Sequence, residues 1–213
     1  MTYKKNPLSP KQAFDALMEG NRRFYSDSLT HTWRVNTERR ENLLAGQSPF
    51  AAVLGCADSR TPPEHIFDAG LGEVFVVRNA GNLVDPISVG SLEYAVEHTG
   101  CPLVCVMGHR HCGAMNATVA AARTPVSSGS PHVDVIIERA MPAVIAARQD
   151  RADNPEWADA ASLMNVALGC REILRISGII AKAVGSGSVG LAGLLYDVGT
   201  GRLEVIGRYG DIL

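Results

Sequence analysis

The chain has 213 residues, of which 46% are hydrophobic and 20% are charged. This length suits one domain with a buried core, because two cores would leave each half small, and we expect a single domain over residues 1–213. The formal net charge of −2 provides no basic field for a nucleic-acid backbone. No apolar run approaches the roughly 18 to 20 residues that span a membrane. The composition therefore argues against nucleic-acid and membrane partners.

The amino-terminal segment and the cysteines both favour a reducing, cytoplasmic location. Residues 1–20 begin with basic residues but contain no continuous apolar segment and no small-residue cleavage site. The five cysteines form an odd set without the dense spacing of a disulfide scaffold. Metal binding is therefore a more plausible role for these cysteines than disulfide formation.

The first predicted element is an amino-terminal helix. Ser9 and Pro10 supply a cap residue and a proline at the first helical position, and Phe14, Leu17 and Phe24 follow at roughly helical spacing. We expect this segment to begin a helical arm over about residues 9–45.

Short apolar runs over residues 50–54, 73–77 and 102–107 predict strands buried on both faces. An expected helix over 87–98 separates the last two strands, and this alternation is typical of a parallel sheet. Further helices are expected over 114–122, 133–148 and 157–184, with a loop over 124–131. Residues 188–198 and 202–206 flank a Gly-Thr-Gly turn and predict an antiparallel hairpin at one edge. The expected fold is α/β, with a central mostly parallel sheet, an antiparallel edge strand and flanking helices.

Chemistry-bearing residues follow two of the predicted strands. The segments are 55–60 (GCADSR) and 108–113 (GHRHCG). Ligands of open α/β sheets bind at the carboxyl ends of the strands, where loops diverge. Cys56, His109 and Cys112 offer two thiolates and one imidazole, a set that suits Zn(II) and leaves one tetrahedral position open. Three protein ligands indicate a catalytic rather than a structural metal site.

His109 is preferred to His111 as the third ligand. A spacing of three residues lets one turn direct His109 and Cys112 to the same ion, whereas His111 would project elsewhere. The amino-terminal end of the following helix also favours the thiolate form of Cys112. Cys101, Cys105 and Cys170 have no partner at ligand spacing and are expected to pack in the core.

Together, residues 56–60 (CADSR) and 109–113 (HRHCG) resemble the signature of β-class carbonic anhydrases. The segments 76–82 (VVRNAGN), 90–96 (GSLEYAV) and 190–198 extend the similarity over nearly the whole chain. The resemblance implies reversible hydration of CO2 to bicarbonate by attack of zinc-bound hydroxide, with one zinc per chain. It also implies a homodimer or homotetramer in which the amino-terminal arm packs on a partner subunit.

The resemblance implies roles for further residues around the metal. The substrate pocket maps onto Gln47, Phe75, Ala80, Tyr94 and Gly113, with Tyr94 contributed by the neighbouring subunit. Asp58 and Arg60 match the catalytic dyad of the family. Asp58 could accept the proton of the zinc-bound hydroxide or could occupy the fourth zinc position itself. A charge-assisted pair with Arg60 would hold it off the metal.

One branch of the family places a tryptophan three residues before the first zinc cysteine, in a bicarbonate pocket that stabilises an inactive form. Val53 occupies that position here, although Arg78 and Tyr196 match other members of the pocket. Because valine lacks the indole N–H and the flat ring, we expect bicarbonate not to inhibit this protein allosterically.

Two other functions are compatible with the same residues. The first is a thiol hydrolase with Cys56 as nucleophile and His109 as base. Cys112 would have no role in such an enzyme, and no metal would be needed. The second is a non-catalytic zinc protein in which Asp58 permanently completes the coordination. Metal analysis separates the first from a carbonic anhydrase, and binding of exogenous anions separates the second.

Overall fold

The computed structural model describes residues 6–30, 36–124, 127–148 and 156–212. Its centre is a five-stranded sheet in the order β2-β1-β3-β4-β5. The strands are β1 (Ala51–Cys56), β2 (Val74–Asn79), β3 (Leu103–His109), β4 (Gly190–Tyr196) and β5 (Leu203–Tyr209). Neighbours pair in parallel except β4 and β5, which are antiparallel. The predicted α/β fold, with its mostly parallel sheet and antiparallel edge strand, is confirmed.

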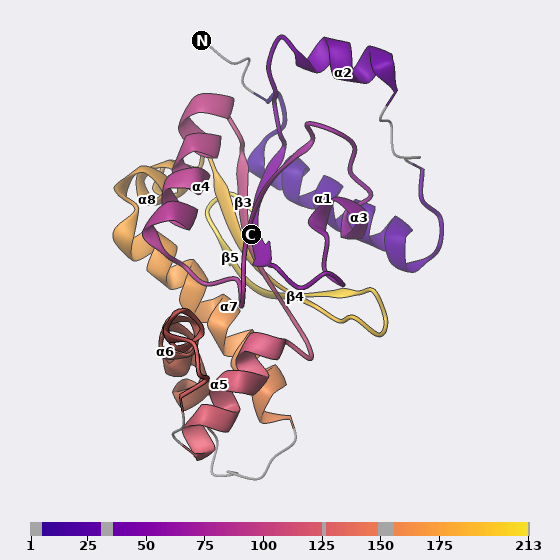
Figure 1. Ribbon diagram of the computed structural model, residues 1–213. Coiled ribbons are helices and arrows are strands. Elements are labelled where there is room, and N and C mark those ends of the chain that lie inside the picture. The colour runs from indigo at the N-terminus through magenta and orange to yellow at the C-terminus, as the bar shows by residue number, and fades with distance from the viewer. Residues whose placement is uncertain (1–5, 31–35, 125–126, 149–155, 213) are drawn as a thin grey trace.

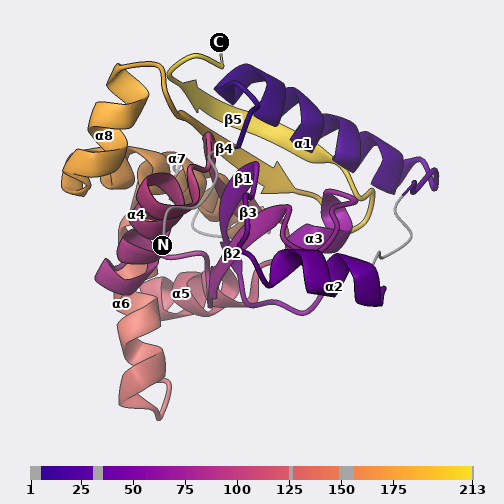
Figure 2. The same ribbon diagram turned by 90° about the horizontal axis from the view of Figure 1, so that it is seen from above.

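Helices cover both faces of this sheet (Figures 1 and 2). On one face lie α1 (Pro10–Tyr25) and the short α3 (Pro63–Ile66), and on the other lie α4 (Pro86–Thr99), α7 (Trp157–Ile176) and α8 (Gly178–Gly185). Strand β1 is buried along its whole length, and its alternate residues enter the two cores: Val53 packs with α1, and Leu54 packs with α4. This double burial explains its continuous apolar sequence.

The amino-terminal helix forms where it is predicted. Ser9 and Gln12 make a reciprocal capping box, and Pro10 occupies the first turn. Phe14 and Leu17 are buried against the sheet of the same chain. The next helix, α2 (Thr37–Leu43), lies within the expected 9–45 arm and has no buried residue.

The helical region expected over 157–184 is divided into two helices at Ser177. This residue adopts an extended backbone conformation, and its hydroxyl oxygen accepts a hydrogen bond from the N–H of Ile180 and so caps α8. The same hydroxyl donates to Glu93 on α4 at 2.6 Å. Serine competes with the helical backbone for hydrogen bonds, which explains a break that the apolar pattern did not reveal.

A third core lies beyond the carboxyl ends of β1 and β3. There α5 (Gly113–Arg123) and α6 (Pro131–Ala146) pack on the first turns of α7, in the lower part of Figure 1. Met115, Val144 and Trp157 belong to this core, together with Cys56 and Cys112. These helices therefore cover the edge of the sheet at which Cys56 and Cys112 lie. Within the described ranges, every helix is too short or too polar to cross a bilayer.

Candidate metal centre

Three candidate ligands converge where two central strands end. Cys56 is the last residue of β1, His109 is the last residue of β3, and the two strands are hydrogen-bonded neighbours. Cys112 is the N-cap residue of α5. The ligand atoms of the three side chains all lie within 4.8 Å of one another, and the three residues are 1–4% exposed. Elsewhere in the described part of the chain, no other group of three histidine, cysteine or acidic residues is gathered in this way.

The imidazole of His109 is oriented for a cation. Its Nδ1 lies 2.9 Å from the carbonyl oxygen of Arg110, which accepts the Nδ1 proton. In that tautomer Nε2 carries a lone pair, and this buried atom has no hydrogen-bond partner. An unpaired buried acceptor beside two thiols is costly unless it binds something. The donor set therefore fits Zn(II).

Cys56 lies in surroundings that favour its thiolate form. Hydrogen bonding from the Cys112 thiol lowers the pKa of Cys56, as do the backbone N–H groups of Asp58 and Gly81, although burial opposes them. The same pairing with Cys56, together with burial, raises the pKa of Cys112. A bound dication would stabilise both sulfurs as thiolates.

Asp58 is held in a fork by Arg60. Nε and Nη2 of Arg60 donate to the two carboxylate oxygens at 2.9 and 2.7 Å, and the Arg60 backbone N–H donates to Oδ1 at 2.9 Å. These bonds hold the pKa of Asp58 well below its usual range, so the carboxylate is ionised at neutral pH. Its Oδ2 lies 3.9 Å from Nε2 of His109, beside the candidate metal position.

Arg78, at the end of β2, fixes the backbone of the same loop. Its guanidinium donates to the carbonyl oxygens of Cys56 at 2.7 Å and Asp58 at 2.6 Å. These bonds tie the backbone of Cys56 and Asp58 to the edge strand. Val53 and Tyr196 occupy the other two positions that were compared with the bicarbonate pocket of one family branch. Both are buried in the core beside α1.

The five predicted pocket residues divide into two sets. Ala80 precedes Gly81, whose N–H contacts the sulfur of Cys56 at 3.3 Å, and Gly113 directly follows Cys112 at the start of α5. These two residues therefore flank the candidate metal centre within one chain.

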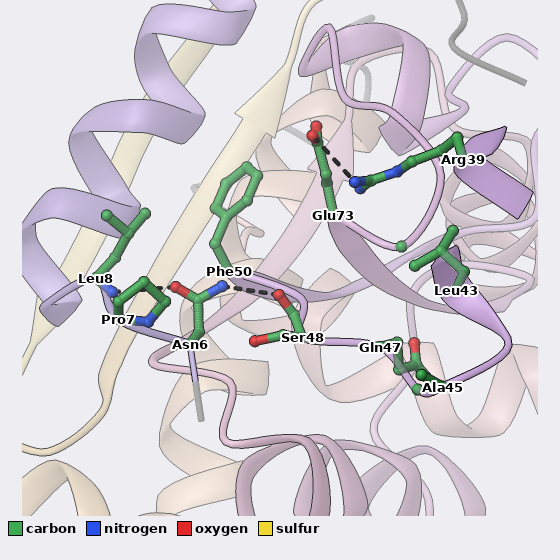
Figure 3. Close-up of a pocket in the computed structure, with 12 residues that line it drawn as sticks. Asn6, Pro7, Leu8, Arg39, Leu43, Ala45, Gln47, Ser48, Phe50 and Glu73 are labelled. Carbon is green, nitrogen blue, oxygen red and sulfur yellow. Dashed lines mark hydrogen bonds and ion pairs between the residues drawn. The ribbon is translucent and has the colours of Figure 1, made fainter. Parts of the chain in front are cut away.

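The other three lie away from the candidate metal centre. Phe75 pairs with Ala52 at the amino end of β2, four residues and about 13 Å along the strand from the level of Cys56. Its ring lies 6.2 Å from that of Tyr94, which is 41% exposed on α4. Gln47 lines a pocket of about 650 Å³ that also includes Arg39 and Glu73, the residue before β2 (Figure 3). One chain does not bring these three residues to the metal centre.

The loop of residues 79–83 contributes contacts that the sequence did not reveal. Gly81 has a φ of +79° and presents its N–H to the sulfur of Cys56. Asn165 on α7 donates to the Gly81 carbonyl oxygen at 2.9 Å, and Asn79 accepts from the N–H of Leu83 at 2.7 Å. The Gly-Asn pair at 81–82 signals a turn. Nothing in the helical pattern of 157–176 singles out Asn165.

The three remaining cysteines are core residues, as expected. Cys101, Cys105 and Cys170 are 0–1% exposed, and burial raises the pKa of each thiol. His111, in contrast, projects into solvent with 71% of its side chain exposed. Its position agrees with the prediction that His109, not His111, faces the two cysteines.

The family model and the similar proteins of known function agree with one another. Residues 51–203 match the family described as carbonic anhydrase. Carbonic anhydrase 2 of Mycobacterium tuberculosis is 37% identical over 207 residues, covering 96% of both chains, and the carbonic anhydrase of Pseudomonas aeruginosa is 32% identical over 199 residues, covering 89% of this chain and 86% of the other.

Solved structures show the same fold. A Coccomyxa β-carbonic anhydrase, in complex with acetazolamide, superposes with a TM-score of 0.69 at 26% identity and covers 90% of this chain and 86% of the other. One of two tetrameric β-carbonic anhydrases from Sordaria macrospora gives 0.68 at 24% identity, with 91% and 96% covered.

Proposed function

Since the chain belongs to the carbonic anhydrase family, with the fold of its β class, we propose that it catalyses the zinc-dependent reversible hydration of CO2 to bicarbonate and a proton. The observation that carries this proposal is the buried convergence of Cys56, His109 and Cys112 around an unpaired imidazole nitrogen. Three ligands leave one tetrahedral position for a small molecule. Zn(II), when bound there, supplies Lewis acidity that makes water a nucleophile near neutral pH.

Asp58 orients the attacking water, and Arg60 holds Asp58 in place. The ionised carboxylate, beside the candidate metal position, accepts a hydrogen bond from that water and orients its lone pair toward CO2. Arg60 restrains Asp58 through two side-chain hydrogen bonds, so that the carboxylate stays out of the fourth metal position. The backbone N–H of Gly113, at the start of α5, binds an oxygen of bicarbonate, and Ala80 borders the substrate.

A second subunit completes the substrate pocket. Gln47, Phe75 and Tyr94 lie far from the metal centre of their own chain, and β2 is an edge strand of the sheet. A homodimer that brings these residues to the partner's metal centre accounts for their places. The solvent-facing α2 is the part of the 9–45 arm that remains for a partner, because α1 packs on its own sheet. The tetrameric Sordaria proteins support a dimer or a dimer of dimers.

Five free cysteines fit a cytoplasmic enzyme.

Stopped-flow CO2 hydration with zinc analysis tests the proposal. The protein as isolated should contain close to one zinc per chain and hydrate CO2, and Cys112→Ser should lose both properties. Cys170→Ala is the matched control, because it removes a buried thiol away from the site and should keep both.

The same assays separate the alternatives. Thiol hydrolase activity that survives metal removal and Cys112→Ser would favour the hydrolase. Zinc that binds no exogenous anion, in a protein without CO2 hydration, would favour a structural metal site.

A further inference from the structure

We infer that Asp159 is a positioning residue that fixes the turn between His109 and Cys112 and so sets the geometry of the metal centre. The inference rests on the proposed function, because it concerns the affinity of that centre for zinc. Asp159 lies in the first turn of α7, far in sequence from the ligands, and its side chain is 18% exposed.

The contact is made to the backbone of His111. The His111 N–H donates to Oδ1 of Asp159 at 2.7 Å, and the His111 carbonyl oxygen accepts from Nη2 of Arg60 at 3.1 Å. His111 has a φ of +58°, a left-handed conformation that is unfavourable for a residue with a side chain. Its own side chain is 71% exposed, and the imidazole Nδ1 lies 3.9 Å from the other carboxylate oxygen of Asp159.

The residues on either side of His111 are anchored to regular structure. The Arg110 N–H donates to the carbonyl oxygen of Tyr196 on β4 at 2.9 Å, and Cys112 is the N-cap residue of α5. Between them the chain must reverse so that a strand-end imidazole and a helix-cap thiol face one ion. The left-handed His111 makes that reversal. Asp159 accepts a hydrogen bond from its N–H, and Arg60 donates one to its carbonyl oxygen. Asp159 therefore couples α7 to the ligand spacing.

A carboxylate in a first helical turn has an alternative role, because it can stabilise its own helix through the helix dipole. That role would change the stability of the metal-free fold and would not depend on a hydrogen-bond acceptor at the His111 N–H. It also predicts equal effects for every neutral replacement. Two neutral replacements of different chemistry therefore separate the two roles.

The experiment compares Asp159→Leu with Asp159→Asn. Both remove the charge, but only asparagine keeps an acceptor oxygen of the same reach. Glu172→Gln is the control, because it neutralises a carboxylate on the same helix that pairs with Arg175. Zinc affinity is measured by competition with a chromophoric chelator, ligand geometry by the absorption spectrum of the Co(II) form, and stability by urea unfolding of the metal-free proteins.

We expect Asp159→Leu to weaken zinc binding about 10- to 100-fold, the usual effect of losing a partner behind a metal ligand, and to alter the Co(II) spectrum. Asp159→Asn and Glu172→Gln should stay close to the wild type in both readouts. Equal loss in the leucine and asparagine variants would overturn the inference in favour of a charge effect. Unchanged affinity in the leucine variant, or a loss explained by unfolding of the metal-free form, would also overturn it. A wild-type protein that takes up no zinc would instead contradict the proposed function.

Discussion

Asn165→Leu tests how the loop over the metal centre is held. Asn165 is 8% exposed, and its side-chain amide donates to the carbonyl oxygen of Gly81 at 2.9 Å. Leucine has a similar volume and no donor, so the replacement leaves a buried carbonyl oxygen unpaired without opening a large cavity. An unsatisfied buried polar group costs about 1–3 kcal/mol. In a domain of this size, each kcal/mol lowers the melting temperature by about 2–4 °C.

Ser162→Ala provides the matched control on the same helix. Ser162 is 2% exposed and donates to the carbonyl oxygen of Ala158, four residues earlier. That carbonyl keeps its helical hydrogen bond when the hydroxyl is lost, so alanine should cost less than about 0.5 kcal/mol.

Thermal and urea unfolding of the metal-free proteins measure both effects. We expect Asn165→Leu to melt several degrees below Ser162→Ala and to bind zinc more weakly, because the Gly81 N–H contacts the sulfur of Cys56. Equal melting temperatures for Asn165→Leu and the wild type would show that the Asn165 hydrogen bond does not stabilise the loop.

Cys112→Ser should lose zinc and activity, whereas His111→Ala should keep its zinc because the side chain faces solvent; zinc loss in His111→Ala would refute the ligand assignment. The lowered pKa of Asp58 means that its ionised form stabilises the fold above the unfolded carboxyl pKa of about 3.9, and that this contribution falls away as the pH drops toward the folded pKa. The stability of the wild type relative to Asp58→Asn, measured in urea, should therefore be greater at pH 6 than at pH 3, and an unchanged difference would count against the Arg60 fork. Rates measured against bicarbonate at fixed pH and ionic strength should show simple product competition, because Val53 offers no indole, and cooperative inhibition with an anion bound beside Val53 would refute that expectation.

The sequence predicts the sheet and the candidate ligands well because both depend on local patterns. Continuous apolar runs mark strands buried on both faces, and the cysteine and histidine motifs follow directly at the strand ends. Cys56 and His109 prove to be the last residues of their strands, which is why their side chains meet.

Contacts that depend on distant segments could not be predicted in this way. The partners of Gly81 and His111 are Asn165 and Asp159, which are 84 and 48 residues away in sequence. Single polar residues on α7 carry no periodic signal, since their roles arise only when the helix packs across the sheet edge. The same reason explains Gln47, Phe75 and Tyr94, whose motif matches gave a pocket that one chain does not assemble.

A zinc titration of the metal-stripped enzyme, followed by stopped-flow CO2 hydration at each step, tests whether activity depends on the metal. The metal-free protein should be inactive, and the rate should rise linearly and reach its plateau at one zinc per chain. A metal-free protein that hydrates CO2 at the full rate would contradict the zinc-dependent mechanism.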